Sequence, residues 1–497
     1  MRLRWNAGLG LLALVAIGLS LFSLERGRSG LEIMQMTVGT TPVTLTQTDG
    51  DSGPLVVIAH GFAGSRQLMQ AYSLTLAQAG YTVLAFDFEG HGRNPVPMSG
   101  DVTAIDGTTR LLVEETRRVI AYGRGLPAAS GGIALLGHSM ATDILVRAAI
   151  AEEREGAPVD SVVAISMFSE AVTAQEPRRL LAISGEWEGR LRQAALSAVR
   201  LIEPDAREGQ TVETNGVVRR AAVAPHVEHV GVLYSATALR EARDWLDHTF
   251  GRQSEAAIVQ PGLWILLLMG GIVLLLRPLV GVLPTKTASE PAPVSAGRFW
   301  AAAAVPALLV PPVATTLYVP FLPVLVADYL MIHLALYGLM QLLILRGGKW
   351  NGSRFSLAAV LVLGVWGIVV FGTAMDRYAA SFMPNAERLT IIAVLAIGTV
   401  PFMISDSTVS GAGCGTWWRR TAARAAILMS LGGAALLDPE QLMFVFIILP
   451  VLLLFFFVHG LMGRWVAQRS GPLSAGVGLG LCLAWALGVS FPLFSAG

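Results

Sequence analysis

The chain has 497 residues, of which 53% are hydrophobic and 14% are charged, and its formal net charge is +1. Ordinary globular proteins carry about 25% charged residues, so this composition excludes a wholly soluble chain. The near-zero charge gives no sign of nucleic-acid binding. Most Asp and Glu residues precede Ser254, and long apolar runs dominate after it. The sequence therefore predicts a soluble domain followed by a polytopic membrane domain.

The first 28 residues have the pattern of a membrane anchor. Arg2 and Arg4 precede an apolar run over 7–22, and further charged residues follow that run. A cleaved signal peptide has a similar layout, but no small-x-small cleavage site closes the run. We therefore predict an uncleaved anchor over residues 1–28, with Arg2 and Arg4 on the cytoplasmic side.

Residues 29–253 contain alternating strand and helix patterns. A loose period-two pattern over 31–47 predicts a hairpin. Continuous apolar runs predict buried strands, and periodic segments between them predict helices: strands over 53–59, 81–86, 132–134, 161–166 and 179–184, and helices over 66–79, 109–124, 142–150 and 236–250. Strands that alternate with helices form a parallel, doubly wound α/β sheet.

A serine lies at one of the predicted strand-to-helix turns. The segment 137–141 (GHSMA) follows the strand that begins at 132 and precedes the helix over 142–150. Its G-x-S-x-A pattern differs by one methyl group from the G-x-S-x-G of a nucleophile turn. The small Gly137 and Ala141 permit a sharp turn. Ser139 would then lie at a helix N-terminus, which favours developing negative charge. By itself this pattern is a weak signal.

Five motifs occur in the order found in one large family. They are 60–62 (HGF), the Asp87…Gly90-x-Gly92 turn, 137–141, 185–188 (GEWE) and 229–231 (HVG). In these motifs the chain resembles the α/β-hydrolase superfamily over about residues 31–250. It departs from the family pattern at Ala141, which replaces a glycine, and at Asn94, where serine is frequent. Neither departure removes a reactive group.

The resemblance also implies where a lid would be inserted. In the superfamily a lid usually follows the strand corresponding to 161–166, but the segment 167–178 is too short to form one. We therefore expect a domain without a large lid. Its site would be open unless the segment 201–223 or the membrane covers it.

The resemblance implies a serine, acid and histidine in that chain order. A serine hydroxyl needs an adjacent base to act as a nucleophile. His229 is the expected base for Ser139, with His226 as its competitor. Glu188 is the expected acid, with Glu186 as the first alternative and Glu170 as the second. A catalytic acid orients the imidazole and stabilises its cation.

An oxyanion needs preorganised N–H donors. The resemblance implies the backbone amides of Met140 and Phe62. Four further polar residues near these motifs are expected to support the loops around the site: His60, Asp87, His91 and His138. The sequence shows no other cluster of His or Cys, so we predict neither a metal ion nor a cofactor.

Residues 258–497 contain eight apolar runs: 262–282, 299–320, 322–345, 355–375, 389–408, 423–438, 441–461 and 474–495. A membrane span needs about 20 apolar residues, and the run at 423–438 is short. With the anchor, the sequence predicts nine spans.

Basic residues gather in alternate loops of this region: Lys286 and Arg298; Arg346, Lys349 and Arg354; Arg419, Arg420 and Arg424; Arg464 and Arg469. The positive-inside rule places these loops in the cytoplasm. The α/β domain then lies on the extracytoplasmic side of the cell (inner) membrane, in agreement with the position of Arg2 and Arg4.

Ionisable groups inside spans are costly and often functional. Asp328 and His333 share one run with Tyr329 and Gln341. Five residues separate Asp328 from His333, so on a helix they lie about 140° apart. The group is either a proton or substrate path, or a set of interhelical hydrogen bonds.

Three functions fit these patterns. The first is a membrane-bound serine hydrolase of the esterase or acyl hydrolase class, which would cleave an ester, thioester or amide of a small-molecule or lipid-like acyl substrate. The second is an acyltransferase with the same residues. The third is a transporter or receptor whose hydrolase-like domain binds ligand without catalysis.

Overall fold

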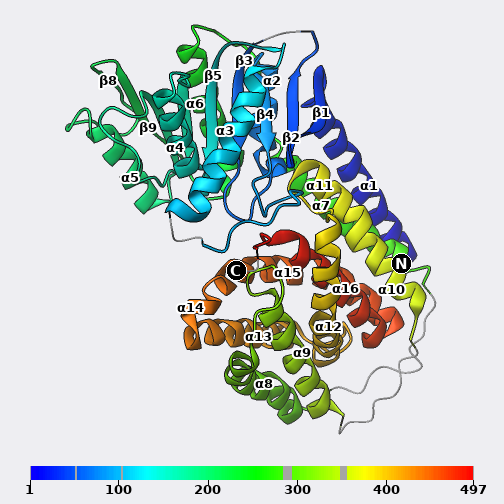
Figure 1. Ribbon diagram of the computed structural model, residues 1–497. Coiled ribbons are helices and arrows are strands. Elements are labelled where there is room, and N and C mark those ends of the chain that lie inside the picture. Colours follow the sequence, from blue (N-terminus) through cyan, green and yellow to red (C-terminus); the bar gives the residue numbers. More distant parts are fainter. Residues whose placement is uncertain (1, 51–52, 102–104, 284–293, 347–354, 496–497) are drawn as a thin grey trace.

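The computed structural model describes residues 2–50, 53–101, 105–283, 294–346 and 355–495. Figure 1 shows an α/β domain above a bundle of helices. Helix α1 (Arg2–Arg26) leads into the α/β domain, and α7 (Gly262–Val280) follows it. Lys286, Lys349 and Arg354, three of the basic loop residues used to predict the topology, lie outside the described residues.

The α/β domain contains a nine-stranded sheet in the order β1-β2-β4-β3-β5-β6-β7-β9-β8. The strands are β1 (Leu31–Val38), β2 (Thr41–Thr48), β3 (Gly53–Ala59), β4 (Thr82–Phe86), β5 (Ala129–His138), β6 (Ser161–Ile165), β7 (Arg179–Gly185), β8 (Thr211–Thr214) and β9 (Val217–Ala224). The pairs from β4 through β3, β5, β6 and β7 to β9 are parallel, and the outer pairs are antiparallel.

Helices cover both faces of this sheet. Side chains alternate along β3, so that Leu55 and Val57 join one core and Val56 and Ile58 join the other. The first core contains residues of α3 (Arg110–Arg124), α4 (Met140–Arg154) and α5 (Gly189–Arg200). The second contains residues of α2 (Gln70–Gln78) and α6 (Ala236–Thr249). Burial on both faces explains why the central strands are apolar throughout.

The predicted fold class, a doubly wound and mostly parallel sheet without a large lid together with a helical region, is confirmed. The predicted helix over 66–79 consists of a 3-10 turn (Arg66–Met69) followed by α2. The segment 201–223 does not cover the site, because it forms β8 and most of β9 at the edge of the sheet. No helix occurs between β6 and β7.

The helical region after α7 contains nine further α-helices among the described residues. They are α8 (Ala296–Leu317), α9 (Ala327–Leu345), α10 (Leu357–Gly364), α11 (Phe371–Tyr378), α12 (Ala386–Val409), α13 (Trp417–Leu437), α14 (Pro439–Leu442), α15 (Val445–Ser470) and α16 (Pro472–Ser490), of which α14 is a single turn; a π-helical segment (Val365–Val370) joins α10 to α11.

Eight helical segments of the described chain are long and apolar enough to cross a membrane, so by these criteria the chain is a membrane protein. They are Asn6–Arg26 of α1, α7, α8, α9, Leu357–Tyr378, α12, α15 and α16. The sequence predicted nine, and the missing one is α13. Its first turns carry Arg419, Arg420 and Arg424, which lower its mean hydropathy.

Helix α13 nevertheless runs from one end of the bundle to the other. At its start, the ring of Trp418 lies 5.5 Å from that of Phe299 at the start of α8. At its end, α14 leads to Phe444, whose ring lies 5.6 Å from that of Phe62 in the α/β domain. Arg424 of α13 pairs with Asp406 of α12 and donates to the Phe456 carbonyl, which compensates its burial.

The loops at the carboxyl ends of β3 and β4 contact the helical bundle. The Ser381 amide donates to Ser65 Oγ at 3.0 Å. The buried guanidinium of Arg388 donates to the Gly90 carbonyl at 3.0 Å. The Met98 amide donates to the Leu493 carbonyl at 2.8 Å. The carboxyl edge of the sheet therefore faces the bundle.

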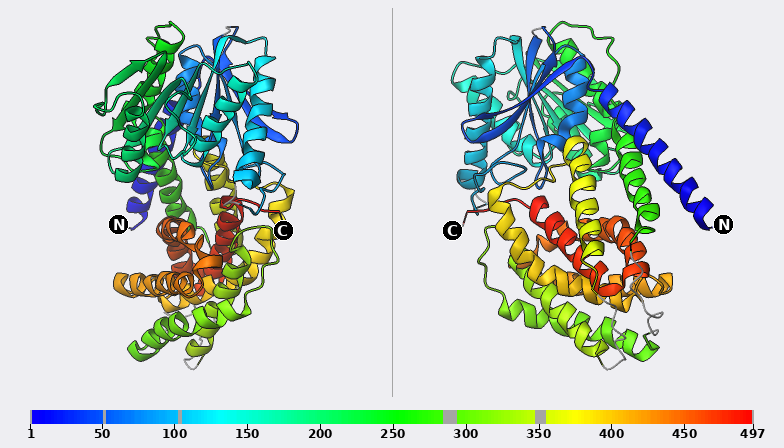
Figure 2. Two further views of the ribbon diagram at one scale, coloured as in Figure 1. Left: turned by 60° about the vertical axis from the view of Figure 1, so that its left-hand side comes forward. Right: turned by 90° about the vertical axis from the view of Figure 1, so that its right-hand side faces the viewer.

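Helices α1 and α7 lie side by side (Figure 2). A Cβ added to Gly271 would lie 2.8 Å from the Ile17 side chain, so this glycine permits the close approach. The α/β domain thus begins and ends at neighbouring helices.

The polar groups of α9 make hydrogen bonds within the bundle. Asp328 accepts from the amides of Phe321 and Leu322. His333 bonds Tyr329 Oη at 2.8 Å through Nδ1 and Ser430 Oγ of α13 at 3.0 Å through Nε2. Gln341 donates to the carbonyl of Ala302 in α8 and accepts from Ser405 of α12. These contacts fit the interhelical role rather than a continuous path from Asp328 to His333.

Candidate active site

Ser139 occupies a strained turn between β5 and α4. Its backbone has φ 54° and ψ −119°, a region that non-glycine residues rarely adopt. A Cβ at Gly137 would lie 2.6 Å from Leu145 Cδ1 and 3.0 Å from Ala141 Cβ, so the turn requires a glycine there. Ala141 is fully buried. The two small residues recognised in the sequence are those that let the turn close.

A chain of two hydrogen bonds joins Ser139 to a carboxylate. His229 Nε2 lies 2.9 Å from Ser139 Oγ, and His229 Nδ1 lies 2.6 Å from Glu188 Oε1. A carboxylate only accepts hydrogen bonds, so Nδ1 carries the proton and Nε2 of the neutral ring accepts from the serine. The three side chains follow β5, β7 and β9 at the carboxyl edge of the sheet.

The second oxygen of Glu188 is held by two donors. Oε2 accepts from the Gly185 amide at 2.6 Å and from Ser166 Oγ at 2.8 Å. Burial alone would raise the pKa of Glu188, but the hydrogen bonds from His229, Gly185 and Ser166 outweigh it and lower the pKa below its ordinary value. Sequence reasoning missed Ser166. The signal was its place at the end of β6, which pairs with the strand that precedes Glu188.

The alternative residues lie elsewhere. Glu186 Oε2 accepts from the His226 amide at 2.7 Å, and both side chains are exposed. Glu170 is exposed in the loop after β6. Among the three acids considered, the structure brings only Glu188 to His229.

Two backbone amides lie in segments beside Ser139. Met140 is the first residue of α4, where amides have no intrahelical acceptor. Phe62 follows Gly61, at which an added Cβ would lie 3.0 Å from Ser139 Cβ, so the glycine lets this loop approach the serine. In the described part of the chain, neither amide donates a hydrogen bond to a protein acceptor. Both are therefore available to an oxyanion.

Residues 50–243 match the model of the serine aminopeptidase S33 family. This region is an α/β-hydrolase domain. The match covers less than half of the 497 residues and includes Ser139, Glu188, His229 and both amides.

Solved structures of hydrolases resemble the domain. The dienelactone hydrolase of Anabaena variabilis is 18% identical with a TM-score of 0.33, over 44% of this chain and 97% of its own. Est1E of Butyrivibrio proteoclasticus, solved with ferulic acid, is 15% identical with a TM-score of 0.32, over 44% of this chain and 100% of its own.

Curated sequences match over a short segment. An uncharacterized protein of Mycobacterium tuberculosis, matched in two strains, is 42% identical over 48 residues, which are 10% of this chain. The match spans 17% of the length of that relative.

Buried histidines support the loops of the hydrolase domain. His138 Nε2 donates to the His229 carbonyl at 2.8 Å, and burial lowers the pKa of His138 to about 4. His60 bonds the Gly61 carbonyl and accepts from the Phe88 amide, and burial lowers its pKa to about 4. At neutral pH both rings are therefore uncharged and hold backbone groups near Ser139.

Asp87 and His91 connect the loops after β3 and β4. Asp87 accepts from the Arg66 amide at 2.8 Å and the Arg93 amide at 3.0 Å. The ring of His91 lies 5.6 Å from that of Phe62, and burial lowers the pKa of His91 to about 3. These contacts place Phe62 between His91 and the helical bundle.

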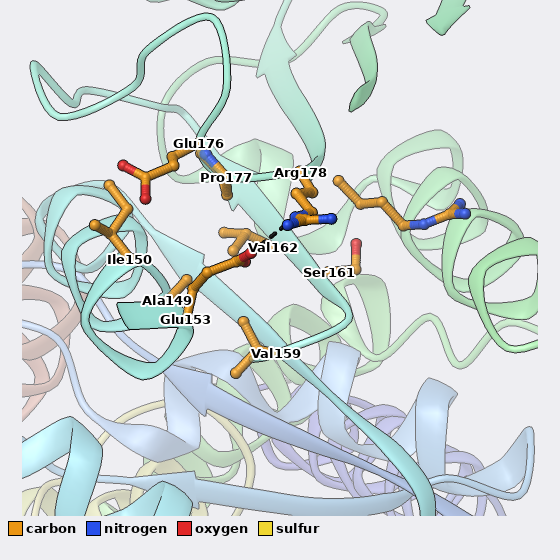
Figure 3. A pocket seen from close by; sticks show the side chains of 10 residues that line it. Ala149, Ile150, Glu153, Val159, Ser161, Val162, Glu176, Pro177 and Arg178 are labelled. Carbon is orange, nitrogen blue, oxygen red and sulfur yellow. Dashed lines mark hydrogen bonds and ion pairs between the residues drawn. The ribbon is translucent and has the colours of Figure 1, made fainter. Parts of the chain in front are cut away.

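Two further features of the hydrolase domain concern metals and the opposite edge of the sheet. The described residues contain no group of three or more His, Cys, Asp or Glu side chains that could hold a metal ion. Figure 3 shows a pocket at Ala149, Ser161 and Arg178 with a volume of about 10 Å³, room for no more than about one water molecule. It lies at the amino ends of β6 and β7, the edge opposite to Ser139.

Proposed function

We propose that the protein is a membrane-bound serine hydrolase of the esterase or acyl hydrolase class, which cleaves an ester, thioester or amide through Ser139, His229 and Glu188. The observation that carries this proposal is the pair of hydrogen bonds at 2.9 Å and 2.6 Å that joins the three side chains. The match of residues 50–243 to a hydrolase family supports it.

In the first half of the reaction, Ser139 Oγ attacks the substrate carbonyl while its proton passes to His229 Nε2. Glu188 stabilises the resulting imidazolium through Nδ1. The amides of Phe62 and Met140 donate to the oxyanion of the tetrahedral intermediate.

In the second half, His229 gives the proton to the leaving alcohol, thiol or amine, and an acyl-enzyme remains on Ser139. Water then attacks the acyl group with His229 as base, which releases the acid and restores the serine. An acyltransferase would differ only in this step, because an alcohol or amine would replace water.

We further propose that the substrate is a small-molecule or lipid-like acyl compound and that the protein spans the cell (inner) membrane, with the hydrolase domain on the extracytoplasmic side. Residues 1–28 would anchor the chain, 29–253 would form the hydrolase domain and 258–497 the membrane domain. Support comes from the carboxyl edge of the sheet, which faces the bundle, and from the basic residues clustered near alternate ends of the apolar runs.

The test uses the purified full chain in lipid. A fluorophosphonate probe should label the wild type and leave Ser139→Ala unlabelled, and a screen of esters, thioesters and amides should find a substrate that only the wild type cleaves. The absence of Ser139-dependent labelling would refute the proposal and favour a binding domain. Transfer of the acyl group to an added alcohol or amine in preference to water would favour an acyltransferase.

A further inference from the structure

A cavity lies between the hydrolase domain and the helical bundle. It has a volume of about 260 Å³ and lies between the sheet residues of β1 and β2 and helix α11. Figures 1 and 2 show α11 reaching from the bundle to the sheet. None of Ser139, His229, Glu188, Phe62 and Met140 lines it. The cavity is therefore separate from the candidate active site.

Three guanidinium groups line the cavity: Arg28, Arg66 and Arg377. Arg28 Nη1 is buried and has no hydrogen-bond partner among the described residues. The nearest carboxylate to Arg28 is that of Glu25, 3.9 Å from its Nε. Glu25 already accepts two closer bonds from Arg377, at 2.7 and 2.9 Å. One carboxylate therefore serves two guanidinium groups.

The remaining carboxylates are occupied by other donors. Asp87 pairs with Arg66 and accepts from backbone amides. Asp376, which lines the cavity, pairs with Arg93 and accepts from the amides of Phe382 and Met383. The cavity thus combines an excess of positive charge with a buried donor that lacks an acceptor, and such a donor costs free energy when unpaired.

The position of the cavity relates it to the membrane surface. Arg28 follows the end of the apolar segment Asn6–Arg26, and Arg377 lies in the last turn of the segment Leu357–Tyr378. Two spans that end on the same side place these residues at the depth of lipid headgroups. Guanidinium groups at this depth lie within reach of anionic headgroups.

We propose that this cavity binds an anionic phosphate-bearing group through Arg28, Arg66 and Arg377. Guanidinium forks match phosphate oxygens, and Gln35 and Thr46 add neutral donors in the same cavity. The volume exceeds that of phosphate alone and accommodates a glycerol-sized substituent. The phosphate group comes either from an anionic lipid or from a soluble phosphate ester. This proposal does not depend on catalysis at Ser139.

The experiment measures binding to the purified full chain in detergent. The probes are glycerol 3-phosphate, dihexanoylphosphatidylglycerol and phosphate-free dihexanoylglycerol, and the readouts are calorimetric titration and native mass spectrometry. Arg28→Gln is compared with Arg26→Gln. Arg26 lies two residues away, carries the same charge, is exposed and does not line the cavity.

Arg28→Gln should weaken binding of the phosphate probe about tenfold or more, since one charged hydrogen bond is lost. Arg26→Gln should leave binding within twofold of the wild type. Binding of the lipid probe alone identifies a headgroup site, and binding of both phosphate probes identifies a phosphate ester site. The proposal is overturned if neither phosphate probe binds, if the phosphate-free lipid binds equally well, or if the two variants weaken binding equally.

Discussion

Replacement of Glu188 by glutamine tests the hydrogen-bond geometry most directly. The carboxylate accepts one bond at Oε1 from His229 and two bonds at Oε2 from Gly185 and Ser166. A glutamine has one acceptor oxygen and one donor nitrogen. It cannot serve both sides of this site at once.

The geometry decides which way the glutamine turns. With its nitrogen at the position of Oε2, a donor would face the Gly185 amide, where the present separation is 2.6 Å. Two donors would be left unpaired, at about 1–3 kcal/mol each. The favoured orientation keeps the oxygen toward Gly185 and turns the nitrogen toward His229 Nδ1. That ring nitrogen must then accept, so the proton moves to Nε2 and Ser139 loses its base.

We expect Glu188→Gln to lower kcat by about a thousandfold to ten-thousandfold, the loss typical of a triad held in the wrong tautomer. Glu186→Gln is the matched control, because Glu186 is exposed and pairs with His226. It should keep kcat within about twofold of the wild type. The assay is hydrolysis of a chromogenic ester, supported by the rate of fluorophosphonate labelling and by Tm. A Glu188→Gln enzyme within tenfold of the wild type, or an equal loss in Glu186→Gln, would refute this reasoning.

Three further predictions concern Ser166, Glu115 and Phe444. Ser166→Ala removes a hydrogen-bond donor to Glu188, so it should raise the pKa of that carboxyl. The acid limb of the pH–rate profile should move to higher pH, and kcat should fall about tenfold. An unchanged profile would contradict this role of Ser166. Burial raises the pKa of Glu115 from 4.5 to about 7. Between these values the folded state binds more protons than the unfolded state, so the free energy of unfolding should fall by about 3 kcal/mol as the pH rises through this window. Glu115→Gln should reduce the difference in Tm between pH 5 and pH 8, and an unchanged difference would show that other groups cause it. Phe444→Ala removes the ring that contacts Phe62 and should lower kcat about two- to tenfold with KM for a short soluble ester unchanged; Phe446→Ala, at an exposed side chain, is the control, and equal effects of the two would exclude the specific contact.

Most strands and most helices of the α/β domain were predictable because local patterns specify them. The run over 53–59 became β3 with the same bounds, since an apolar run buried on both faces leaves little choice of structure. Helix α5 and the strands β8 and β9 were not predicted. The four-residue β8 is so short and polar that it carries no period-two signal, and it pairs only with β9.

The site was partly predictable for a similar reason. Ser139 lies in a turn whose small neighbours can be read in the sequence, and the family order pointed to His229 and Glu188. The second donor to Glu188, Ser166, depends on which strands are neighbours in the sheet. The contact of Phe62 with Phe444 joins residues far apart in the chain, so only the folded structure shows it.

The membrane topology shows where composition and packing disagree. The three arginines of α13 keep its hydropathy below that of a span. In the folded bundle one of them, Arg424, reaches an acid on α12 and a carbonyl on α15. A hydropathy window does not contain that information, because it sees one helix at a time.

The placement of the α/β domain between α1 and α7 has a mechanical consequence. Both of its connections leave from adjacent helices, and its β3 and β4 loops are bonded to the bundle. These contacts fix the orientation of the domain relative to the bundle. In the proposed membrane arrangement, the same contacts would set the tilt of the domain against the bilayer. A substrate would then approach Ser139 at a fixed height above the bilayer, by diffusion through the water layer or within the plane of the lipid.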